Sequence, residues 1–348
     1  MIDPSSKLLT VLLATFSGPI FAAEFDITAF AGGEIWDSSS ASGHGIVSVR
    51  TDVAGLAGDS SGFIEFNTDT IRLSVDDIVV GAGAVLGASL TGELGIGNLL
   101  TEYFFDGDND SSRGFFASYG RADFWVKFNT FTNLFVTLSG SGRRWFFHPT
   151  ERTDLDLVLP SESLAFEPEA HVTWWGLSSD AAWYQPHRLS PRLSGMAIGA
   201  GVRGVFLSEA EPWGYLVDKV GSERTNNPNT TMLLLNQWLL WGREISGSTR
   251  IEFTERASVM IGEDDLYRAV IGGMSPYSVN LPGAPWGYYH GDDFVAVSSR
   301  IAHRLLSNVD MELGPVFGAI YLRDESREGG RGFSAQYGYG LYTDIRVG

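Results

Sequence analysis

The stretch "RGFSAQYGYGLYTDIRVG", residues 331–348, decides the fold class of this chain. From Phe333 to Val347 every second residue is apolar apart from Thr343, whereas the residues between them are mostly polar or small. A period of two with one apolar and one polar face is typical of a β-strand. The alternation is longer than the ~3–10 residues of most strands in soluble proteins. Its two faces therefore point to two different solvents.

Four other stretches repeat the pattern, at residues 84–96, 196–206, 250–262 and 309–321. In each, one face is apolar and the other carries glycine, serine, threonine and scattered charges. A large soluble β-sandwich or propeller is the alternative, but sandwich strands are usually shorter and their outer face is normally polar. Lipid requires every backbone polar group to be paired, so a sheet in a membrane must close on itself. The pattern predicts an all-β protein that folds as a closed antiparallel transmembrane β-barrel.

Turn-forming residues separate these stretches, at Asp106–Gly114, Ser139–Gly142, Ser246–Ser248 and Asp324–Gly332. Other connections are predicted to be long, at 148–165, 208–231 and 274–292. Tight turns that alternate with long loops are typical of transmembrane barrels. The alternating segments indicate about 14 strands, within a range of roughly 12–16, because several segments are ambiguous.

The composition excludes several classes of protein. Charged residues make up 19% of the chain, against a typical ~25%, and the 42 glycines among 348 residues exceed the usual ~7% share. The chain has no cysteine, which excludes a disulfide scaffold and a thiolate metal site. Its net charge of −18 argues against a nucleic-acid partner, because phosphate binding needs a basic surface.

The N-terminal residues 1–22 resemble a secretory signal peptide. Lys7 precedes an apolar run from Leu8 to Phe16, and the small residues Ala22 and Ala23 follow. The run is shorter than the ~20 residues that a helix needs to cross a bilayer, and a buried first helix is the alternative. We predict cleavage after Ala22, export to the cell outer membrane of a Gram-negative bacterium, and a single transmembrane β-barrel domain over residues 23–348.

The export signal, the long alternating strands and the aromatic final strand resemble those of bacterial outer-membrane β-barrel proteins. The resemblance implies contact with outer-membrane lipid and lipopolysaccharide, and with the barrel-assembly machinery during biogenesis. A narrower likeness rests on "GVRGVF" at 201–206, "IGGMSP" at 271–276 and the later Arg300. It resembles the surface-antigen (Omp85-type) barrels, which insert or translocate proteins and carry an inward loop with a Val-Arg-Gly-aromatic motif. Here Val205 replaces the aromatic residue, and the motif lies within a predicted strand.

If the apolar face of each strand contacts lipid, the charged residues on the opposite faces line the lumen. These residues are Glu93, Asp123, Lys127, Arg203, Arg250, Glu252, Arg256, Asp310, Glu312, Asp344 and Arg346. They form either a charged constriction that selects solutes or a set of paired ions that fills a closed barrel, since buried charges need partners. The nearly equal numbers of acidic and basic residues suit pairing, and both interpretations stay open.

No metal or cofactor site is predicted. The stretch "DGDNDSS" at 106–112 has the aspartate spacing of a calcium loop, but Ser111 and Ala117 replace its glycine and glutamate. A flexible acidic turn is therefore the better interpretation. The six histidines show no spacing that is typical of metal ligands.

No catalytic residue is assigned either. Outer-membrane hydrolases use a histidine with acidic or serine partners near the strand ends, and two polar loops offer such a combination. The candidates are His148 with Glu151 and Asp154, and His290 with Asp292 and Asp293. Long polar loops bring such residues close together in sequence by chance.

The stretch "MLLLNQWLLW" at 232–241 breaks the alternation, because both of its faces are apolar. It is either a strand whose inner face packs on a plug or loop, or an interfacial helix. The sequence leaves these two alternatives open.

The sequence predicts a porin-like channel that passes small solutes across the outer membrane. A surface-antigen barrel for protein insertion or translocation is the second hypothesis, and an embedded hydrolase or purely structural barrel is the third. Inward folding of the 274–292 loop, with an arginine stacked in the lumen, favours the second. The transported solute and the oligomeric state do not follow from the sequence.

Overall fold

The computed structural model describes residues 23–36, 40–54, 61–67, 70–81, 84–93, 104–105, 108–109, 114–131, 133–176, 195–214, 225–226, 229–262, 266–272, 279, 281–282, 289–306, 311–324 and 333–347. The predicted signal peptide, residues 1–22, lies outside them. Within this part of the chain no helix is long and apolar enough to cross a membrane.

The described residues form β-strands joined by turns and loops. The strands are β1 (Ala23–Trp36), β2 (Ser40–Ala54), β3 (Ser61–Asn67), β4 (Thr70–Gly81), β5 (Ala84–Glu93), β6 (Phe104–Phe105), β7 (Asp108–Asn109), β8 (Phe115–Phe131), β9 (Leu134–Pro149), β10 (Leu164–Trp175), β11 (Gly195–Leu207), β12 (Trp213–Gly214), β13 (Thr225–Asn226), β14 (Thr231–Ser246), β15 (Thr249–Ile261), β16 (Ala269–Ile271), β17 (Tyr289–Leu306), β18 (Met311–Asp324) and β19 (Phe333–Val347).

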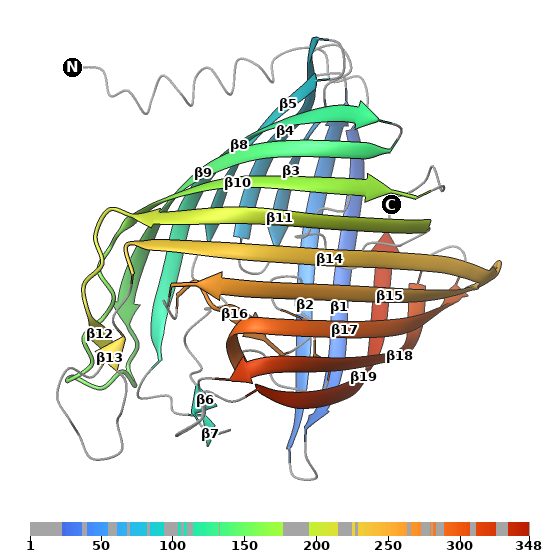
Figure 1. Cartoon of the computed structure of the whole chain (residues 1–348). Helices are drawn as coiled ribbons and strands as arrows, with labels where there is room; N and C mark the ends of the chain where they lie inside the picture. Colours follow the sequence, from blue (N-terminus) through green and yellow to red (C-terminus); the bar gives the residue numbers. More distant parts are fainter. Residues whose placement is uncertain are drawn as a thin grey trace.

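The long strands form a closed antiparallel ring (Figure 1). The main sheet has 15 strands, and β15 also pairs with β17, which leaves the short β16 beside the ring and 14 strands within it. The first and last strands pair from Ile27 opposite Val347 to Glu34 opposite Gly340. The predicted closed barrel, its strand number and the pairing of its two ends are thus confirmed.

The two faces of the ring differ as the opening stretch indicates. On β19, Phe333, Tyr337 and Leu341 are exposed, with Tyr337 at 76%, whereas Ser334 and Gln336 are half-buried. The same alternation places Phe124, Phe166, Phe206 and Tyr321, among many others, on the exposed face of their strands. An apolar outer face suits contact with lipid, so the opposite face is the lumen side.

The turn predicted at Ser139–Gly142 is wrong, because these residues lie in the middle of β9. The turn between β8 and β9 instead contains Asn133, whose φ angle of 65° is in the left-handed region. Gly140 serves packing, because a Cβ at this position would lie 2.6 Å from the ring of Phe124 on the neighbouring strand. The turn predicted at Ser246–Ser248 is confirmed, since β14 ends at Ser246 and β15 begins at Thr249.

The stretch at 232–241 lies within strand β14, which decides between the two alternatives. Leu233 and Leu235 are exposed on the outer face. Met232 and Leu234 are buried on the lumen side, in a cluster that also contains Tyr267. Both faces are apolar because one contacts lipid and the other packs against a loop of the same chain.

Candidate functional site

Part of the connection between β15 and β17 folds onto the lumen side of the ring. We call its described residues, 266–272, 279, 281 and 282, the inner segment. Ile271, Val279 and Leu281 pack with Phe294, Ala296, Ile320 and Leu322, all of which are buried residues of β17 and β18. The predicted long loop at 274–292 thus places at least Val279, Leu281 and Pro282 against the inner wall.

The two ends of the inner segment contact different parts of the wall. At one end, Tyr267 is buried in the cluster formed by Ala165, Val205, Met232, Leu234 and Met260, from β10, β11, β14 and β15. At the other end, a side chain at Gly338 of β19 would overlap the backbone carbonyl of Pro282. The inner segment therefore lies across the lumen side between β10 and β19.

An aromatic cluster lies beside Tyr267, at the end of the barrel that carries the 150–163 and 208–230 connections. Phe115, Trp145, Phe147 and Trp213 form its buried core, and Leu266 of the inner segment packs on it. The ring of Phe115 lies 5.8 Å from that of Phe147 and 5.7 Å from that of Trp213, both edge-to-face. Described parts of three loops thus meet over this end of the inner wall.

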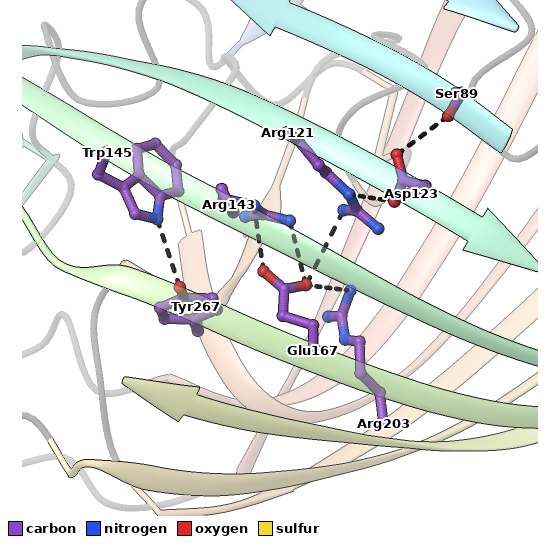
Figure 2. A network of polar contacts seen from close by, with 8 residues as sticks. All are labelled: Ser89, Arg121, Asp123, Arg143, Trp145, Glu167, Arg203 and Tyr267. Atoms are coloured by element: carbon purple, nitrogen blue, oxygen red, sulfur yellow. Dashed lines mark hydrogen bonds and ion pairs between the residues drawn. The ribbon is translucent and has the colours of Figure 1, made fainter. Parts of the chain in front are cut away.

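A polar network centred on Glu167 of β10 lies next to this cluster (Figure 2). The side chain of Glu167 is only 1% exposed, and arginines from three other strands surround it. Its carboxylate lies 3.1 Å from Nε of Arg143, 3.9 Å from Nη1 of Arg121 and 3.8 Å from Nη1 of Arg203. Because a buried carboxylate without partners is strongly unfavourable, these contacts hold β8, β9, β10 and β11 together from the inside.

The network continues to β5 through Asp123. Arg121 donates to Asp123 over 2.5 Å, and Ser89 donates to the second oxygen of the same carboxylate over 3.0 Å. Asp123 therefore relieves part of the charge of the three arginines. Farther along β10, Glu169 lies 3.8 Å from His171.

Arg143 connects the polar network to the aromatic cluster. Its guanidinium carbon lies 5.0 Å from the ring centre of Tyr119, 5.4 Å from that of Trp145 and 5.7 Å from that of Tyr267. The indole nitrogen of Trp145 also donates to the hydroxyl of Tyr267 over 3.4 Å. One cation thus contacts Glu167 of the wall and Tyr267 of the inner segment at the same time.

A second network lies near the tight turn between β14 and β15. Arg250 donates to Glu252 over 2.5 Å and to Glu312 of β18 over 2.8 Å, and Arg300 of β17 donates to Glu252. Both glutamate side chains are 4% exposed. Two arginines and two glutamates hold three neighbouring strands in this network.

The predicted lumen-lining residues fall into several groups. Asp123 and Arg203 belong to the first network, and Arg250, Glu252 and Glu312 to the second. Lys127 is buried on β8, with Nζ 4.7 Å from the ring centre of Phe135, and Arg256 is half-buried on β15. The backbones of Glu93, Asp344 and Arg346 lie in β5 and β19, but their side chains are outside the description, as is the whole of Asp310.

Sequence reasoning missed Arg121, Arg143, Glu167 and Arg300 as members of these networks. Arg121 could have been found, since it lies two residues before Asp123 and therefore on the same strand face. Glu167 was hidden because Pro168, a residue that is uncommon inside sheets, interrupts the alternation of its strand. In the structure Pro168 opposes Gly140 of β9, whereas its pairing with β11 is interrupted.

The structure describes only part of the hydrolase candidates. His148 is exposed on β9, on the same face as the exposed Phe146. Asp293 accepts from the backbone amide of Met260 over 3.2 Å and lies 3.5 Å from Arg323. Asp154 and Glu151 lie in the 150–163 loop, and the side chains of His290 and Asp292 are outside the description.

No metal site is visible in the described ranges, where no group of three or more histidine and acidic side chains has a geometry that could hold an ion. The calcium-like stretch at 106–112 lies outside those ranges except for β7. The Val202-Arg203-Gly204 motif lies within β11, as predicted, and Arg203 contacts Glu167.

Comparisons with known proteins identify the fold. No family model and no curated protein sequence matches the chain. Among solved structures, CdiB from Escherichia coli matches with a TM-score of 0.51 and 10% identity over 92% of this chain, which spans 62% of CdiB.

Two further structures have lower scores. BamA from Haemophilus ducreyi lacking POTRA domains 1–3 matches with a TM-score of 0.48 and 10% identity, over 93% of this chain and 70% of that one. The outer membrane channel DcaP of Acinetobacter baumannii matches with 0.43 and 9% identity, over 93% and 97%. From its closed ring, its apolar outer face and its likeness to CdiB, the chain has the fold of the bacterial outer-membrane β-barrels.

Proposed function

We propose that the protein is an outer-membrane channel that passes small solutes through a lumen narrowed by the inner segment. The observation that carries the proposal is the contrast between the two faces of the ring, which is apolar outside and charged along the wall inside. Barrels of about 8 strands are filled by side chains, whereas those of about 16–18 leave an aqueous channel. A ring of 14 strands lies between these limits, so it has room for the inner segment and for a narrow path.

The proposed path runs beside charged wall residues that select the solute. The described candidates are Asp123, Lys127, Arg203, Arg250, Glu252, Arg256 and Glu312, with Glu93, Asp310, Asp344 and Arg346 as further candidates from the sequence. Both networks pair opposite charges, so the wall offers donors and acceptors without a large excess of one sign. Such a wall suits small polar solutes.

The proposal includes the route by which the chain reaches its membrane. Residues 1–22 act as a signal peptide that is cleaved after Ala22. The barrel-assembly machinery then inserts the barrel, whose outer face contacts lipid and lipopolysaccharide. We assign no catalytic residue, no cofactor and no nucleic-acid partner.

Single-channel recording in planar lipid bilayers tests the channel function. Folded, purified protein is expected to give stepwise current increments, and the heat-unfolded sample provides the control. A folded sample that gives no current steps over a wide range of voltages and salts would contradict the proposal. Replacement of salt by larger ions then measures the width of the path.

A role in protein insertion or translocation is the second candidate. The observation in its favour is the inner segment, which places buried Arg268 and the aromatic Tyr267 on the lumen side. Deletion of the gene separates the two functions: a channel predicts slower uptake of small polar solutes, whereas an insertion role predicts loss of particular outer-membrane proteins.

A further inference from the structure

We infer that Arg143 is the positioning residue that latches the inner segment against the barrel wall, and that loss of this latch lets the inner segment leave the wall. The inference concerns the regulation of the proposed channel. Its effect on current rests on the proposed function, but the docking of the inner segment does not. The latch consists of Arg143 and Trp145 of the wall and Tyr267 of the inner segment, and Figure 2 shows these residues.

The first observation is that Tyr267 combines apolar packing with directional contacts to the wall. In the cluster around Tyr267 the wall contributes alanine, valine, leucine and methionine, which pack without directional bonds. The directional contacts of Tyr267 include the hydrogen bond from Trp145 to its hydroxyl and the approach of the Arg143 guanidinium to its ring. These contacts fix where on the apolar wall the segment docks.

The second observation is that Arg143 is itself held in place by a carboxylate and two aromatic rings. Glu167 pairs with its guanidinium, which donates through Nη2 over 3.3 Å, and the ring centres of Tyr119 and Trp145 lie 5.0 and 5.4 Å from the guanidinium carbon. A cation that is partly removed from water interacts more strongly with aromatic faces than an exposed one. The wall thus presents a fixed cation to which a tyrosine of the inner segment can dock.

The third observation is a neighbouring arginine that makes similar contacts on the opposite face. Arg144 lies 5.5 Å from the ring centre of Phe146 and 3.5 Å from Glu162, but its side chain is 59% exposed. Its two partners are Phe146 on the outer face of β9 and Glu162 in the 150–163 loop. Arg143 and Arg144 therefore form a matched pair in which only one arginine should affect docking.

A single-cysteine probe can measure whether the inner segment is docked, because the chain has no cysteine of its own. Ala165 of β10 has no exposed surface and lies in the Tyr267 cluster, so Ala165→Cys reports uncovering of that cluster to a water-soluble maleimide. Ala302 of β17 is equally buried, and Ala302→Cys reports general loosening of the barrel. The protein is full-length and folded in lipid vesicles.

The expected result is a rise of about tenfold in the labelling rate of Ala165→Cys when Arg143→Met is added, because the cation is lost. Arg144→Met should leave that rate unchanged, and Ala302→Cys should label equally slowly in all backgrounds. Tyr267→Leu removes the latch from the side of the inner segment without changing the charged network, and should give the same rise. It serves as the test if Arg143→Met does not fold.

Unchanged labelling with Tyr267→Leu would overturn the latch, and so would an equal rise with Arg144→Met or a parallel rise at Ala302→Cys. Bilayer currents recorded on the same variants separate this inference from the proposed function. Faster labelling without any current supports the latch and contradicts the channel. Larger currents without faster labelling support the channel and overturn the latch.

Discussion

The two arginine–glutamate networks of the inner wall use the same residue types but connect different parts of the chain. Around Glu167, three arginines from three strands share one buried carboxylate, and one of them, Arg143, also contacts the inner segment. Around Glu252 and Glu312, two arginines meet two carboxylates, next to a tight turn. The second network is balanced in charge, whereas the first depends on a single glutamate for several partners.

This difference indicates that the charge balance and the position of a lumen network decide which parts of the chain it connects. A balanced network near a tight turn cross-links neighbouring strands. An unbalanced one needs additional partners, which Asp123 and the aromatic rings supply. The aromatic partners are what couple the wall to a separate piece of chain.

The largest effect is expected from Glu167→Gln. The substitution keeps the shape but leaves three arginines around a neutral amide, and removal of one partner from a buried ion pair costs about 3–5 kcal/mol. Urea titration of the folded barrel in detergent micelles should show this loss in the free energy of unfolding. A loss below that of Glu252→Gln would contradict the view that the first network depends on one carboxylate.

Glu252→Gln is expected to have a smaller effect, about 2–3 kcal/mol, because Glu312 remains in contact with Arg250. The same urea titration measures it. In addition, maleimide labelling of Ala165→Cys should not change, since Arg143 and Tyr267 are not members of the second network. Faster labelling in this variant would remove the distinction between the two networks.

Gly338→Ala addresses the other end of the inner segment. A methyl group at this position would overlap the Pro282 carbonyl, and overpacking of this kind costs about 1–3 kcal/mol. Gly142→Ala is the matched control, because nothing lies within 4 Å of a Cβ at that strand position. Equal unfolding midpoints in urea for the two variants would show that Pro282 does not press on β19.

The closed barrel could be predicted from the sequence because lipid and lumen select opposite residue types on alternating positions. The "RGFSAQYGYGLYTDIRVG" stretch contains this signal over its whole length, and its pairing with the first strand follows from closure. The partners of Glu167 could not be predicted in the same way. They depend on the register between four strands, and one of those strands was obscured by Pro168.

The docking of the inner segment was even less visible, because it joins residues that are far apart in the sequence. Met232 and Leu234 gave a hint, since an apolar inner face requires something apolar to cover it. That hint does not identify Tyr267 as the cover. The contact between Trp145 and Tyr267 spans 122 positions and follows only from the folded ring.

The smallest effect is expected from Tyr267→Phe, which separates the two directional contacts of the latch. The substitution keeps the ring over Arg143 but removes the hydroxyl that accepts from Trp145. A hydrogen bond of this kind contributes about 0.5–1.5 kcal/mol, so labelling of Ala165→Cys should accelerate less than in Tyr267→Leu. If Tyr267→Phe and Tyr267→Leu label equally fast, the hydrogen bond holds the inner segment and the Arg143 cation does not. If Tyr267→Phe labels at the native rate, the ring contact alone is sufficient, and the polar network of the wall is then coupled to the inner segment through the charge of Arg143.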